Sequence, residues 1–186
     1  MDAITALHTT DPLVAKLISG LTADQRDLPT PCTEWTVHEL LDHMCVASHK
    51  AAQALADQDP DEVVDHLADG PVSGWARVAA ALDAASTPDA VAATHQMPFA
   101  PVPMEVPGEF LLGAVVVDHL VHAWDLATAS AQPFAIDDDL AEWALTTVHQ
   151  MAPVEGRTGH PFGPVVSVGD DASLTDQLVA YTGRRP

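Results

Sequence analysis

The segment from about Pro107 to Ser130 constrains the fold more than any other part of the chain, because it is apolar on nearly every face of a helix. A helix of this kind is buried, either in a protein core or in a membrane. The apolar run from Phe110 to Val117 stops at Asp118, which makes it too short to cross a bilayer. We therefore expect a core helix that other helices surround. Its apolar residues include Leu111, Leu112, Val115, Val116, Val117, Leu120, Val121 and Leu126.

The rest of the chain also carries mostly helix signals. Pro12 stands where it can break the first helix or delay its start. Thr36 and Glu39 form a capping-box pattern that opens the second helix. The stretch from Ala92 to Pro107 contains four prolines and is expected to be extended, with room for a short β-ribbon. The expected helices cover about Ile4 to Leu21, Thr36 to Asp57, Pro60 to Leu67, Pro71 to just before Pro88, Ile136 to Met151, and a short segment after Ser173.

These elements predict an all-α protein, a small helix bundle with a short extended or β segment and a C-terminal extension. A chain of 186 residues has the length of one compact domain and can bury roughly 70% of its unfolded surface. Hydrophobic residues make up 47% of the sequence and aromatic residues only 5%, which favours closely packed helices. We expect a single domain over residues 1–186, with the bundle at about 3–151 and the extension at about 152–186.

The charge balance limits the partners that such a protein can have. There are 27 acidic residues against 7 basic ones, for a net charge of −20. This charge repels nucleic acid and anionic membranes, which bind clusters of Lys and Arg. The N-terminus lacks the features of a signal peptide, and two cysteines, Cys32 and Cys45, do not make a disulfide scaffold. We expect a cytoplasmic protein that binds neither nucleic acid nor anionic membranes, and we interpret both cysteines as packed residues.

Three polar residues form a stripe on the apolar helix. Asp118, His122 and Asp125 fall within a sector of roughly 60° on a helical wheel. Asp118 and His122 are one turn apart, so their side chains can reach a common point. If the helix is buried, these groups need partners, and a divalent cation would satisfy both. On periodicity alone, a solvent-facing stripe is the favoured alternative. His119, beside the stripe, competes as a ligand.

The second helix offers three candidate partners for that stripe, His38, His43 and His49. His43 lies at the margin of the apolar side, whereas the other two project toward the more polar side. A lone histidine in such a place is more often structural than ligating. The pattern alone does not choose His43.

Three blocks of sequence resemble one known family. They are the run from Pro29 to Val37 with Leu40-Leu41-Asp42-His43, the run from Asp118 to Leu126, and the tail from Phe162 to Pro186. In this order they resemble the mycothiol-dependent maleylpyruvate isomerase-like metal-binding family, which belongs to the DinB-like four-helix bundles. The blocks span nearly the entire chain.

The resemblance implies a metal held by one histidine of the second helix and by an acidic residue and a histidine at i and i+4. Here these are His43, Asp118 and His122, and Asp125 is then an acceptor that orients a ligand histidine. The isomerase itself has Glu where this chain has Asp118. It also has a further C-terminal domain that contributes to its active site, so we do not expect isomerisation of maleylpyruvate from these residues.

Two imidazoles and a carboxylate suit Zn²⁺ with an open coordination position, and Ni²⁺ or another ion is compatible with the same ligands. The resemblance implies mycothiol as cosubstrate, and a chain with two Lys against five Arg fits an actinobacterial source. We expect a metal-dependent, thiol-using transferase or isomerase that acts on a small electrophile, with a homodimer compatible with its apolar helix faces. The alternatives are a non-catalytic bundle that binds a metal or small ligand, such as a sensor or stress-response module, and a bundle without metal.

Overall fold

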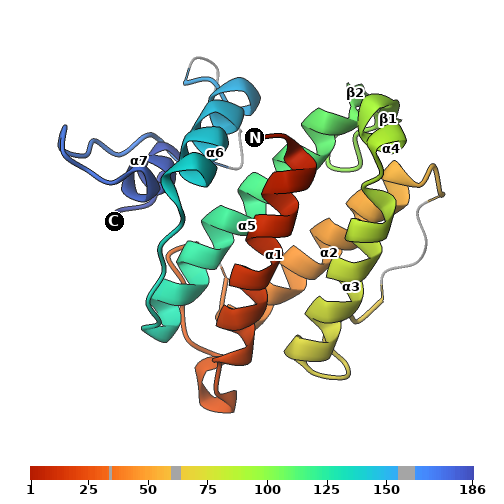
Figure 1. Ribbon diagram of the computed structural model, residues 1–186. Coiled ribbons are helices and arrows are strands. Elements are labelled where there is room, and N and C mark those ends of the chain that lie inside the picture. Colours follow the sequence, from red (N-terminus) through yellow and green to blue (C-terminus); the bar gives the residue numbers. More distant parts are fainter. Residues whose placement is uncertain (34, 60–63, 155–161) are drawn as a thin grey trace.

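The protein is mostly helical, as the sequence predicts, and carries a small two-stranded sheet (Figure 1). The computed structural model describes residues 1–186 except 34, 60–63 and 155–161. The elements are α1 (Ala3–Ser19), a 3₁₀ turn (Ala23–Gln25), α2 (Val37–Leu55), α3 (Pro71–Ala85), α4 (Pro88–Ala92), β1 (Thr94–Gln96), β2 (Glu105–Pro107), α5 (Gly108–Ser130), α6 (Asp138–Met151) and α7 (Leu174–Tyr181).

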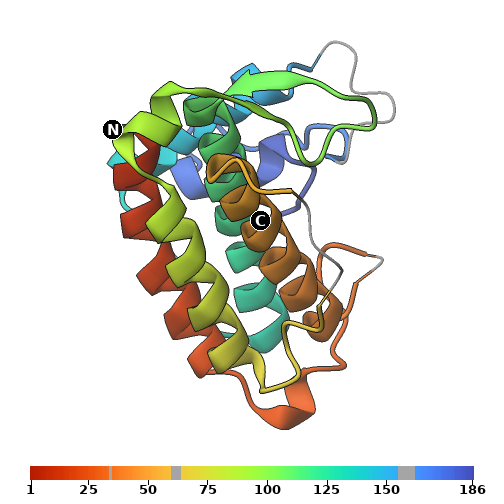
Figure 2. The same cartoon turned by 90° about the vertical axis from the view of Figure 1, so that its right-hand side faces the viewer.

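Four long helices form the bundle that the sequence predicts. α1 packs against α5, α5 against α2, α2 against α3, and α3 back against α1. α1 and α3 lie side by side in both views (Figures 1 and 2). α6 packs on α5 and α7 packs on α6, which brings the C-terminal part of the chain to the side of the core helix.

The core helix is α5. Seventeen of its 23 residues are buried. Among the described residues it is the one helix long and apolar enough to cross a membrane, but 83% of its most apolar window is buried inside the protein. Its composition is therefore that of a helix surrounded by protein.

The helix starts follow local chemistry. At α2, the Thr36 hydroxyl accepts a hydrogen bond from the Glu39 N–H, while the Glu39 carboxylate accepts one from the Thr36 N–H at 2.8 Å.

α1 is continuous through Pro12 rather than broken there or delayed. Its apolar side, which includes Leu7 and Val14, is fully buried, and this packing holds the helix together across the missing N–H of Pro12.

The extended stretch contains the expected β-ribbon, in which β1 pairs antiparallel with β2 and His95 faces Val106. The helix expected from Pro60 to Leu67 is not observed in its described part, because residues 64–67 form no helix. Its first four residues, like residue 34 of the first family block and residues 155–161 of the expected extension, lie outside the described residues.

Candidate metal centre

His43, Asp118 and His122 come together from two helices. His43 projects from α2, and the other two project from successive turns of α5. The Nε2 atom of each histidine lies 3.3 Å from Oδ1 of Asp118. The rings of His43 and His122 meet nearly edge to face, with centroids 5.0 Å apart. One ligand atom from each residue lies within 4.8 Å of the other two, a spacing at which a single cation could contact all three.

The polar stripe on α5 is not a solvent face. His122 is 6% exposed and Asp125 is fully buried, while the Asp118 side chain keeps 25% of its surface exposed. The solvent-facing alternative is therefore wrong. The apolar residues on every other face leave α5 no polar side to turn outward, so these three groups must be satisfied inside the protein.

Charges at the centre hold both groups of α5 in their ionised forms. Burial raises the pKa of the Asp118 carboxyl, but the nearby imidazoles of His122 and His43 outweigh burial and hold that pKa well below its usual range. Burial also lowers the pKa of His122, yet the carboxylates of Asp118 and Asp125 raise it to about 9. Without a metal, His122 is therefore an imidazolium between two carboxylates at neutral pH.

The donor set fits a divalent cation. The Nδ1–H of His122 donates to Oδ2 of Asp125 at 3.0 Å, so deprotonation of Nε2 leaves a lone pair directed at Asp118. Oδ2 of Asp118 is buried and has no hydrogen-bond partner within the described part of the chain. A buried carboxylate oxygen without a partner is costly, and a cation would remove that cost.

Asp125 is fixed from the opposite side by the C-terminal tail. Arg184 donates to both of its oxygens, from Nε at 3.2 Å and from Nη2 at 2.7 Å, and its Nη1 donates to the carbonyl of Thr182 at 3.2 Å. The hydrogen bonds from Arg184 and His122 hold the pKa of Asp125 below its usual value, against the effect of burial. Sequence reasoning missed Arg184, because no periodic pattern links a tail residue to a helix 59 positions earlier.

The loop before α2 forms another wall of the site. The Thr30 hydroxyl donates to the carbonyl of Trp35 at 2.9 Å and closes the loop. The Trp35 ring then packs on the rings of His43 and His122, with centroids 4.5 and 5.6 Å away. The same loop carries Cys32, which is half-buried.

A cavity of about 620 Å³ opens onto the centre. This volume lies within the range of small-molecule sites. Cys32, Trp35, His43, Asp118, His122 and Arg184 all contribute to its wall. A small molecule in the cavity would therefore contact the candidate ligands directly.

Comparison with known proteins finds one family model and two relatives. The family model for the mycothiol maleylpyruvate isomerase N-terminal domain matches residues 9–127. This chain belongs to that family. It is also 31% identical to uncharacterized proteins from two strains of Mycobacterium tuberculosis, over 99% of this chain and 98% of theirs. No solved structure matches it.

The region matched by the mycothiol maleylpyruvate isomerase N-terminal domain contains the whole candidate ligand set. His43, Asp118, His122 and Asp125 all lie within it, whereas Arg184 lies beyond its end. The contact between Asp125 and Arg184 therefore joins the family domain to a segment that the family model does not cover.

His119 is placed away from the centre. It is fully buried, and its Nε2 lies 2.9 Å from the Ser48 hydroxyl, which itself donates to the carbonyl of Met44. Its ring meets the Trp75 ring edge to face at 4.9 Å. Burial lowers the pKa of His119 to about 4, so it is a neutral core histidine.

The two cysteines differ in their surroundings. Cys45 is fully buried, and burial raises the pKa of its thiol to about 12, as expected for a packed residue. Cys32 is near enough to His122 and Asp125 to form a second candidate ligand group. However, both oxygens of Asp125 already accept hydrogen bonds from Arg184, so that group offers a cation a weaker carboxylate than Asp118 does.

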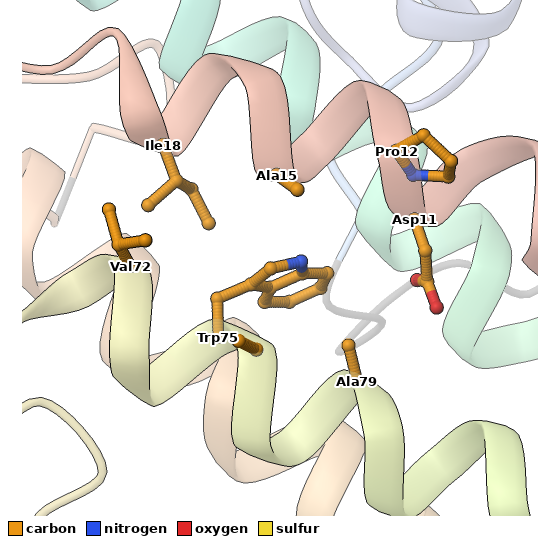
Figure 3. Close-up of a pocket in the computed structure, with 8 residues that line it drawn as sticks. Asp11, Pro12, Ala15, Ile18, Val72, Trp75 and Ala79 are labelled. Carbon is orange, nitrogen blue, oxygen red and sulfur yellow. The ribbon is translucent and has the colours of Figure 1, made fainter.

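A second hollow, of about 270 Å³, lies between α1 and α3 (Figure 3). The indole of Trp75 lies between the two helices, and its Nε1 has no hydrogen-bond partner within the described residues. Burial and the charge of Asp83 raise the pKa of Asp11, on the rim of the hollow, to about 7. We assign no ligand to this hollow. The raised pKa of Asp11 makes the free energy of unfolding depend on pH.

Proposed function

We propose that this protein binds one divalent metal ion, Zn²⁺ in preference to Ni²⁺ or another ion, through His43, Asp118 and His122. The observation that carries the proposal is their convergence at the wall of a large cavity, where both imidazoles contact Oδ1 of Asp118 and its Oδ2 has no partner within the described residues. Asp125 would then orient His122, with Arg184 holding Asp125 in place. His119 is no longer a candidate ligand in this proposal.

We further propose that the protein is a mycothiol-dependent transferase or isomerase that acts on a small electrophile. A bound metal ion would lower the pKa of a coordinating thiol and so favour the nucleophilic thiolate. The chain's own residues would orient that thiol, because Trp35 restricts one side of the centre and the cavity leaves the other side open. Membership of the mycothiol maleylpyruvate isomerase N-terminal domain family supports the choice of thiol.

A non-catalytic metal- or ligand-binding bundle is the second candidate, and one observation favours it. On the described wall of the cavity, the imidazoles, the carboxylate and the guanidinium are all engaged with one another or with Asp125. Such a wall leaves none of these groups available as a separate general acid or base. As far as the described wall residues go, a reaction at this site would therefore rely on activation of the thiol.

The remaining parts of the proposal rest on composition. A net charge of −20 supports the absence of nucleic acid and anionic membranes among its partners and fits a cytoplasmic location. The mycobacterial relatives fit an actinobacterial source. A homodimer remains compatible with these observations and is not needed to complete the centre.

Elemental analysis of protein purified without a His-tag tests the metal. We expect about one equivalent of a divalent metal in the wild type, after reconstitution if necessary. His43→Ala and Asp118→Asn should lose it. His38→Ala is the matched control, because His38 is exposed on the same helix and should leave the metal content unchanged. A wild type that holds no metal after reconstitution would reject the proposal.

Thermal unfolding with added mycothiol separates an enzyme from a metal binder. A thiol that binds the native metal centre should raise the melting temperature, because it stabilises the folded state by a free energy that grows with the logarithm of its concentration over its Kd. We expect this shift in the metal-loaded wild type and not in His43→Ala. A metal-loaded protein that shows no shift with mycothiol or other cellular thiols would favour the non-catalytic binder.

A further inference from the structure

The cavity over the candidate centre gathers residue types that are rare in this chain. The sequence contains five Met and four Phe. Three of each line this one cavity, namely Met97, Phe99, Met104, Phe110, Met151 and Phe162. They come from the β1–β2 connection, from α5, from the end of α6 and from the segment before α7. A wall built of scarce residues from four places indicates a selected surface rather than ordinary core packing.

These side chains suit an apolar occupant. Met is flexible and polarisable, and Phe supplies large apolar faces, so together they adapt to ligands of varied shape. Two of them remain open to solvent, because Phe99 is 41% exposed and Met104 is 45% exposed. A ligand that covers them would remove apolar surface from water, which is favourable at roughly 25 cal/mol per Å².

The same wall does not suit a carboxylate. Arg184 is its one permanently cationic side chain among the described residues, and it already makes two hydrogen bonds to Asp125 and one to the carbonyl of Thr182. A ligand carboxylate entering the apolar part of the cavity would lose its hydration without gaining an unpaired cation.

We propose that the Met and Phe wall of this cavity selects an uncharged electrophile with an apolar aromatic or branched aliphatic body, and discriminates against carboxylates of the same shape that do not reach a bound metal. The role of this molecule as an electrophile rests on the proposed function. Its binding to the apolar wall does not, because the six Met and Phe side chains contact the ligand whether or not a metal is bound.

The test uses two probes of nearly the same size and shape, 4-phenylbutan-2-one and 3-phenylpropanoate. The first is an uncharged methyl ketone, and the second has a charged carboxylate oxygen in place of the methyl group. Calorimetric titration is run on the full chain as purified and after removal of metal with a chelator, with circular dichroism as a check on folding. We expect the ketone to bind at least tenfold more tightly than the carboxylate after chelation. If the carboxylate binds before chelation and not after it, the carboxylate binds to the metal. The ketone then still binds more tightly than the carboxylate to the chelated protein, as we expect.

A pair of variants in one loop locates the binding. Phe99→Ser should weaken ketone binding at least fivefold, because Phe99 lines the cavity. Val102→Ser is the control, since Val102 lies in the same loop, is 64% exposed and is not part of the wall. Equal effects of the two variants, equal binding of the two probes after chelation, or no ketone binding at all would overturn the inference. Metal content and the thiol shift are measured separately, so each result is assigned to its own proposal.

Discussion

The contact between Asp125 and the C-terminal tail allows the sharpest test of how the centre is held. In Asp125→Asn, the side chain keeps its size but loses its charge and one of its two acceptor oxygens. In one orientation the amide NH₂ then faces Nε of Arg184, and in the other it faces both Nη2 of Arg184 and Nδ1 of His122. Three hydrogen bonds converge on this fully buried carboxylate in the wild type, so the variant cannot satisfy all of its neighbours.

Two separate losses follow from this geometry. Removing one partner of a buried ion pair typically costs about 3–5 kcal/mol of folding free energy, because Arg184 remains buried without its counter-charge. Loss of the group that orients a ligand histidine typically weakens metal binding by about 10- to 100-fold. That range equals about 1.4–2.8 kcal/mol of binding free energy.

Urea unfolding of chelated protein measures the first loss, and competition with a chromogenic chelator measures the second. We expect Asp125→Asn to lose about 3 kcal/mol or more in the first assay and at least tenfold in the second. Arg184→Gln and the double variant complete a cycle, in which the coupling between the two residues should exceed about 1 kcal/mol. Wild-type metal affinity together with a stability loss below about 1 kcal/mol would refute the reasoning.

Three further perturbations address other parts of the structure. Metal binding at pH 7 should release about one proton from His122, because its pKa is about 9 without metal. Calorimetry in buffers of different ionisation enthalpy measures this release, and finding no released proton would contradict the prediction. His119→Ala should cost about 2–4 kcal/mol in urea unfolding and leave the metal content unchanged, because it empties a core site rather than a ligand position. Asp11→Asn should stabilise the protein by about 1–2 kcal/mol at pH 8 and by nothing at pH 4. The pKa of Asp11 is about 7 in the folded state and 3.8 in the unfolded state. Protonation of Asp11 therefore stabilises the wild type fully below pH 3.8, and this stabilisation is lost as the pH rises through 7. An equal difference between Asp11→Asn and wild type at both pH values in urea unfolding would contradict that assignment.

The parts of the fold that local chemistry decides could be predicted from the sequence. The composition of α5 alone indicates a buried helix, and 17 of its residues are buried. The capping box of Thr36 and Glu39 places the start of α2. The convergence of Asp118 and His122 on one point also follows from a spacing of one turn.

Long-range partners could not be predicted in the same way. Periodicity gives His43 a place at the margin of an apolar stripe but does not say which helix it faces. Arg184 lies in the tail block that resembles the family, but nothing in the sequence pairs it with Asp125, because a tail residue acquires its partner only when α6 and α7 fold back onto α5. The continuity of α1 through Pro12 likewise depends on burial by neighbouring helices rather than on the residues around the proline.

The charges that surround α5 bear on the kind of ligand that the proposed metal would take. Without metal, the carboxylates of Asp118 and Asp125 are balanced by the guanidinium of Arg184 and the imidazolium of His122. A divalent cation that displaces the proton of His122 replaces one positive charge with two, which leaves a surplus of one inside a largely apolar site. A buried surplus is costly unless an anion neutralises it. A thiolate supplies that charge and a neutral ligand does not, so burial itself would favour the deprotonated, nucleophilic form of the thiol.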